Sequence, residues 1–170
     1  RNNGCWLLRL NQQPPSYLFE NIPDRDDAAH DIASQVEPAL ELTDDTEKPT
    51  LFMMFDSMLP DVGTIVENLY LHLADSVHYA GVNAGSETFQ PMPCLFDAFR
   101  IIQNGVWCML LPAWAGMLLE HGYPAPDKVI SATSAEGNRI ISIDWQPAFD
   151  VYKQLVLEEC DVELSADNFY

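Results

Sequence analysis

The residues best suited to chemistry lie at positions 81–94, in the stretch GVNAGSETFQPMPC. Polar side chains there can donate or accept hydrogen bonds, Gly85 lets backbone amides approach a bound group, and Phe89 offers an apolar wall. The polar side chains are those of Asn83, Ser86, Glu87 and Thr88. This combination is typical of a loop that binds a small polar molecule. A plain turn, capped by Ser86 or Thr88, is the alternative.

Asp56 and Ser57 form a second candidate group, because they directly follow the apolar residues 51–55. Open α/β sheets place ligand-binding groups at the carboxyl ends of their strands. The same residue types also commonly cap the helix that follows such a strand, and the sequence leaves both roles open. Glu87 would suit a ligand ammonium group, such as that of an amino acid or another small amine.

The sequence does not indicate a catalytic centre or a metal site. Cys94 is the best candidate nucleophile, but His78 and His121 stand in no motif with it, and a buried inert thiol is the alternative. His72 and His78 do not share one helical face, which argues against a metal site. We therefore expect no enzyme, no metal and no cofactor, with a cysteine-dependent enzyme as the least favoured alternative.

These candidate residues must be positioned by a sheet with helices packed against it. Apolar runs predict buried strands at residues 51–55 and 105–111, and residues 76–81 are a further short strand candidate. An apolar stripe after Pro60 predicts a helix between residues 51–55 and 76–81. The order strand, helix, strand indicates an α/β fold with a mixed, partly parallel sheet flanked by helices.

Further elements are expected near the two ends of the chain. Residues 5–10 predict a strand, and the acidic region that follows predicts a helix at residues 25–36. Residues 128–133 and 139–144 flank a turn and predict a β-hairpin near the C-terminal end. A further helix is expected to open at Pro147.

Composition restricts the class of protein. The 170 residues are 48% hydrophobic, which predicts one folded domain over residues 1–170. With 8 basic and 26 acidic residues the net charge is −18, so nucleic acid and anionic lipid would be repelled. The four separated cysteines and the absence of an apolar run of about 20 residues predict reduced thiols, a cytoplasmic location and no membrane insertion. The first residue is not Met, and we expect a piece of a longer chain.

Several short motifs follow one another in a specific order. They are FMMFD at 52–56, YAGVNAG at 79–85, GVWCML at 105–110, and a final set of Thr133, Gly137, Asn138, Ile143, Asp144, Pro147, Ala148 and Tyr152. In this order they resemble the amino-terminal half of the FIST sensory domain, with the best match over residues 50–155. The family usually has a glycine after the residue corresponding to Asp144, where this chain has Trp145.

The resemblance implies an intracellular sensory module that binds a small ligand, with amino acids proposed. A signalling output protein or domain would be its partner, and homo-oligomerisation is left open. Ligand binding would favour one arrangement of the loop and so bias the partner. The alternative is a scaffold or adaptor without a small ligand, which would hold a protein through its acidic surface and the aromatics near Trp114 and Tyr123.

Overall fold

The computed structural model describes residues 7, 9–42, 48–85, 90–112, 116–118, 122, 129–137 and 139–165. The chain divides into two compact units, Arg1–Leu118 and Leu119–Tyr170. Each unit is described by itself.

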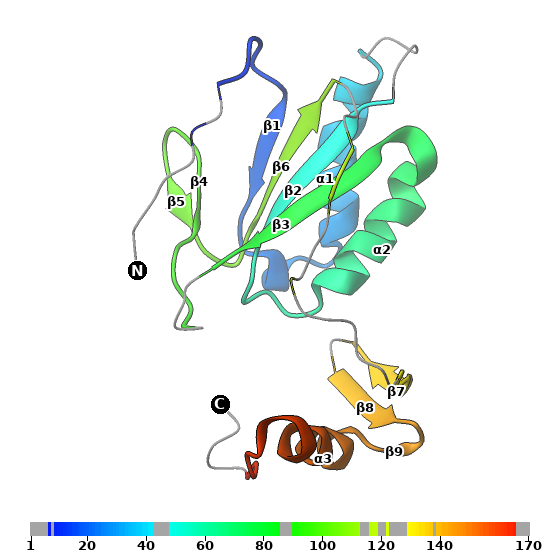
Figure 1. Ribbon diagram of the computed structural model, residues 1–170. Coiled ribbons are helices and arrows are strands. Elements are labelled where there is room, and N and C mark those ends of the chain that lie inside the picture. The colour runs from blue at the N-terminus through cyan, green and yellow to red at the C-terminus, as the bar shows by residue number, and fades with distance from the viewer. Residues whose placement is uncertain are drawn as a thin grey trace. The chain divides into compact units, whose positions relative to one another are not determined.

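The first unit is built on a four-stranded sheet in the order β1-β6-β2-β3 (Figure 1). β6 (Val106–Leu111) lies between β1 (Ser16–Phe19) and β2 (Thr50–Asp56) and is antiparallel to both. β2 runs parallel to β3 (His78–Ala84), and α2 (Val62–Leu73) makes the crossover that parallel neighbours require. The predicted α/β class with a mixed, partly parallel sheet is confirmed.

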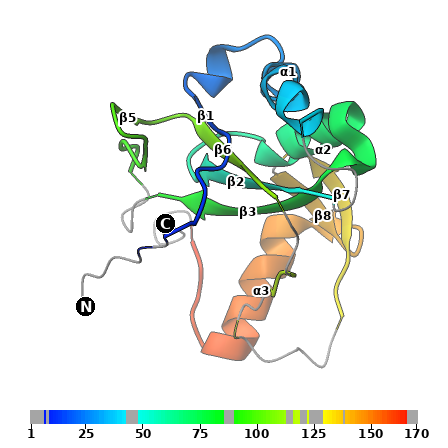
Figure 2. The ribbon, with the colours of Figure 1, turned by 90° about the horizontal axis from the view of Figure 1, so that it is seen from above.

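Both long helices of this unit lie on one side of the sheet, as Figure 2 shows. α1 (Ala28–Leu40) follows a short 3-10 helix, η1 (Ile22–Asp24), and packs beside α2, which is followed by η2 (Ala74–Ser76). The largest fully buried apolar side chains come from these helices, from the strands and from nearby turns: Ile32, Val36, Leu51, Leu69, Val77, Leu95, Val106 and Cys108.

The two faces of β2 differ in burial more than its sequence predicts. Leu51, Met53 and Phe55 are buried, whereas Phe52 and Met54 between them are only partly buried. Successive side chains of a strand point to opposite faces, and both helices cover the same face. The predicted burial of this strand is therefore complete on one face and partial on the other.

A small hairpin that the sequence analysis did not predict precedes β6. β4 (Leu95–Phe96) pairs antiparallel with β5 (Ile101–Ile102) across a tight turn. Leu95 and Ile102 are opposite each other and are buried. Two-residue strands carry too little periodicity to be seen in a sequence.

β1, one edge strand of the sheet, lies further along the chain than the strand expected at residues 5–10. In that segment the described residues 7, 9 and 10 are not in a strand, so the prediction is wrong for them. β1 begins instead just after Pro14 and Pro15, and the Leu110 N–H donates to the Pro15 carbonyl at 2.9 Å. Proline and the residue before it favour an extended backbone, which suits the entry to an edge strand.

The second unit contains the predicted hairpin and helix. β7 (Ala132–Glu136) pairs with β8 (Arg139–Ile143), and β8 pairs with β9 (Gln146–Pro147). α3 (Ala148–Cys160) begins directly after Pro147, which is its N-cap. The hairpin is confirmed, although its first strand begins four residues later than predicted. Among the described residues of this unit, none is fully buried.

The turn between β8 and β9 has an unusual backbone. Asp144 and Trp145 have φ values of 47° and 66°, in the left-handed region that glycine adopts most easily. The Trp145 N–H donates to Thr133 Oγ1 at 2.9 Å, and the Ser131 N–H donates to Asp144 Oδ1 at 3.1 Å. The indole of Trp145 is largely exposed, so tryptophan replaces the expected glycine without covering the turn.

Candidate functional site

The carboxyl ends of β2 and β3 meet at one edge of the sheet and bring four predicted site residues together. Asp56 is opposite Ala84 in the parallel register, and Phe55 is opposite Asn83. Gly85 follows directly and lies against Ser57. A Cβ added at Gly85 would lie 1.9 Å from the Ser57 hydroxyl oxygen and 3.0 Å from its Cβ, so only glycine fits without movement.

Asp56 links the segments that form this edge. Its side chain is 2% exposed, and both carboxylate oxygens accept backbone hydrogen bonds. Oδ1 accepts from the Met58 N–H at 3.0 Å and Oδ2 from the Asn104 N–H at 2.7 Å. The N-cap of α2 is Asp61, so Asp56 does not cap the helix. Asp56 instead holds the turn after β2 against the turn before β6 and positions its neighbours.

At Cys94 the chain returns to the edge of the sheet where β2 and β3 end. Its N–H donates to the Ile102 carbonyl at 3.0 Å, and its Sγ lies 3.8 Å from the Ala84 carbonyl oxygen. Partial burial, the charge of Asp56 and a hydrogen bond to Asp56 together raise the pKa of the thiol to about 11, with burial as the largest cause. At neutral pH this group is a thiol that donates hydrogen bonds, not the activated thiolate that a cysteine enzyme uses.

Both ends of the 85–94 loop are therefore fixed beside Asp56. Ser57 and Asn83 are exposed there and can reach a bound molecule. Ser86, Glu87, Thr88 and Phe89 lie outside the described residues, and their part in the site stays a prediction, as does the role of Trp114 and Tyr123. Sequence reasoning missed Asn104 and the place of Cys94, because no pattern near Asp56 indicates partners so far along the chain.

A hollow of about 420 Å³ lies close to this edge, where α1 and α2 begin. Its lining includes two helix N-termini with their partial positive charges, and the charged residues Arg25, Asp26, Asp27 and Asp61. Asp27 is the N-cap of α1 and accepts from the His30 N–H at 2.9 Å. The sequence does show an acidic residue directly before each of the two helices, Asp27 before α1 and Asp61 before α2. The sequence-based prediction of the site did not include them.

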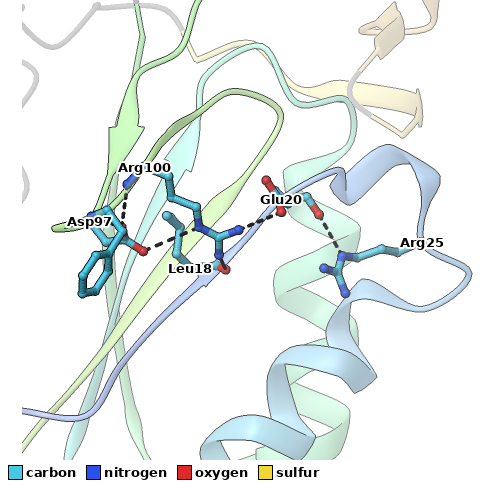
Figure 3. Close-up of polar contacts among 6 residues, drawn as sticks. Leu18, Glu20, Arg25, Asp97 and Arg100 are labelled. Carbon is cyan, nitrogen blue, oxygen red and sulfur yellow. Dashed lines mark hydrogen bonds and ion pairs between the residues drawn. The ribbon is translucent and has the colours of Figure 1, made fainter.

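The β4–β5 hairpin that follows the loop is held firmly by two charged residues, as Figure 3 shows. Asp97 accepts from the N–H groups of Phe99 and Arg100 at 2.8 and 3.0 Å, and these bonds and the Arg100 charge lower its pKa. Arg100 reaches β1 by donating to the Leu18 carbonyl at 3.0 Å. It also pairs with Glu20 at 2.7 Å and with Asp97 at 3.6 Å.

Within the described residues, no three His, Cys, Asp or Glu side chains come close enough together to hold a metal ion. In the same part of the chain, no helix is both long and apolar enough to cross a membrane.

Comparison with known proteins gives one match. A family model described as FIST N domain matches residues 9–146, which runs from before β1 to the first residue of β9. The resemblance drawn from the motifs is thereby confirmed, although Pro147, Ala148 and Tyr152 lie beyond the matched range. Searches of curated proteins and of solved structures gave no significant match.

Proposed function

Because this chain belongs to the FIST N domain family, a family of sensory and signal-transduction domains, we propose that it senses a small polar ligand inside the cell. The ligand would be an amino acid or another small amine. A signalling output protein or domain would receive the signal from this chain. On this proposal the chain is a cytoplasmic binding module and not an enzyme.

The observation that supports this proposal is the convergence at the carboxyl edge of the parallel strands. Asp56, Ser57, Asn83 and Gly85 come together there, and both ends of the 85–94 loop are anchored beside them. In open α/β sheets such edges are where ligands are usually held. The exposed Ser57 and Asn83 can hydrogen-bond a ligand, while the buried Asp56 holds the turn at Asn104 in place.

The loop side chains would complete the site. Glu87 would pair with the ligand ammonium group, Ser86 and Thr88 would orient it, and Phe89 would pack on its apolar part. A ligand that binds one arrangement of this loop more tightly shifts the population toward that arrangement. The β4–β5 hairpin continues directly from the loop at Cys94, so it would pass such a shift to the surface.

A thermal-shift screen of the whole chain against the common amino acids and simple amines tests the proposal. A ligand that binds only the folded state raises its stability by mass action, by about 2.7 kcal/mol at a hundred times its Kd. We expect one chemical class to raise the Tm reproducibly. The Glu87→Gln and Ser86→Ala variants should lose this shift while keeping the Tm of the ligand-free protein.

Two control variants make the result specific to the loop. Glu37→Gln removes one exposed carboxylate from α1 and should leave the shift unchanged. Asp61→Asn removes a carboxylate from the hollow and keeps a residue type that tolerates the left-handed φ of 56° found there. If Asp61→Asn abolishes the shift and Glu87→Gln does not, the ligand sits in the hollow. A folded chain with no shift from any probe would contradict the sensory proposal and favour the scaffold.

A further inference from the structure

The β4–β5 hairpin has an apolar outer side. The inward pair, Leu95 and Ile102, is buried, and the next pair, Phe96 and Ile101, is opposite across the strands and points away. Phe96 is 70% exposed and Ile101 67%, and Phe99 in the turn is 94% exposed. Single exposed apolar residues are common, but three large ones on one short hairpin indicate an interaction surface. We call these three residues the hairpin patch.

The hairpin patch is held in a fixed shape. The Asp97 carboxylate accepts from the N–H groups of Phe99 and Arg100 and closes the turn. The Asp97 N–H donates to the Arg100 carbonyl at 3.0 Å, and Arg100 ties the hairpin to Leu18 and Glu20 (Figure 3). A surface that is ordered before binding loses less conformational entropy when a partner docks.

The charges around the hairpin patch restrict its partner. Arg100 is shared between two carboxylates, Glu20 and Asp97, and Arg25, which contacts the Glu20 carbonyl, is paired with Asp31. The whole chain carries a net charge of −18. A second copy of the chain would bring the same negative charge and be repelled, and so would an anionic lipid surface. A partner with lysine or arginine beside an apolar surface is complementary to the hairpin patch in both charge and polarity.

We propose that the hairpin patch, Phe96, Phe99 and Ile101, docks a protein partner that presents an apolar surface flanked by basic side chains. Aromatic residues are frequent among those that dominate binding energy at interfaces, so Phe96 and Phe99 carry most of the affinity. This surface is separate from the proposed ligand site, and its use does not require that a ligand binds there.

Fluorescence anisotropy with a defined probe tests this docking surface. The probe is a labelled amphipathic helical peptide of leucine and lysine, measured at physiological salt, where long-range attraction is screened. We expect Phe96→Ser and Phe99→Ser, which leave the charge unchanged, each to weaken its binding about tenfold or more. Leu71→Ser, which changes an exposed leucine on α2, should leave binding within about twofold.

Four outcomes would overturn the proposal. Equal binding by the wild type and both Phe variants would mean that the peptide follows the acidic surface alone. Binding to phosphatidylcholine vesicles that Phe99→Ser abolishes, with peptide binding unchanged, would assign the hairpin patch to a membrane. Sedimentation that shows a dimer lost in the Phe99→Ser variant would assign it to a second copy. A charge-reversed peptide of leucine and glutamate should not bind. If it does bind, the partner need not be basic.

Discussion

At the scale of single residues, the Asp56 carboxylate organises the candidate site. It accepts from Met58, two positions away, and from Asn104, which is 48 positions away. The sequence could mark Asp56, because a polar residue directly after an apolar strand is a local pattern. The sequence could not identify Asn104 or Cys94 as neighbours of Asp56, because only the tertiary fold brings them to this edge.

Cys94 gives a test of this arrangement through its pH dependence. Burial and the neighbouring Asp56 disfavour the thiolate and raise the pKa to about 11, so the reactive form is scarce at neutral pH. We expect alkylation of Cys94 by iodoacetamide to be slow at pH 7.5 and to rise steadily toward pH 11. Asp56→Asn removes a negative charge and should lower this pKa, so the variant should react faster at pH 7.5. Mass spectrometry of the labelled peptides measures both rates.

Cys160 is the internal control for that labelling, because it lies exposed on α3. It should react first, at a rate that Asp56→Asn does not change. Fast labelling of Cys94 at pH 7.5 in the folded wild type would show that Asp56 does not suppress its ionisation. It would also favour the alternative that the protein is a cysteine-dependent enzyme.

At the scale of elements, two glycines should respond in opposite ways to alanine. A Cβ at Gly81 in β3 would lie 2.6 Å from the Met53 backbone oxygen, which cannot move without disturbing β2. A Cβ at Gly63 in the first turn of α2 meets nothing within 4 Å. We expect Gly81→Ala to lower the free energy of unfolding by about 1–3 kcal/mol. Gly63→Ala should raise it by up to about 1 kcal/mol.

Urea denaturation followed by circular dichroism measures both changes, and each variant is the control for the other. If Gly81→Ala leaves the free energy of unfolding unchanged, β2 and β3 must be able to move apart easily at this point. In that case the register at the start of the loop is not as tightly fixed as the contact between Gly81 and Met53 implies.

The elements that could be predicted are those with enough length for a pattern. α2 and β2 follow from apolar spacing and from a continuous apolar run. β1 has only four residues, and its pairing with β6 is set by the sheet and not by its own sequence. The β4–β5 hairpin has strands of only two residues, and no local pattern indicates that Arg100 ties it to Leu18 and Glu20.

At the scale of the whole molecule, every buried residue of the described part of the chain belongs to the first unit. The stability of small domains depends on buried apolar surface, so the two units should differ when separated. We expect a fragment of residues 1–118 to unfold cooperatively in urea. A fragment of residues 119–170 should show no cooperative transition.

The full-length chain is the reference for this experiment. If the 1–118 fragment does not fold while the full chain does, the core of the first unit depends on the second. If the 119–170 fragment unfolds cooperatively, it holds a core outside the residues described for that unit. Either result would contradict the expected difference.

During synthesis on the ribosome, β1 emerges long before the strand that pairs with it. β2, α2 and β3 follow one another between Thr50 and Ala84 and can assemble as soon as this segment has left the exit tunnel. Ser16–Phe19 must wait until Val106–Leu111 has been made, because β6 separates β1 from β2 in the sheet. Of the four strands of this sheet, the first to be translated is therefore among the last to be joined.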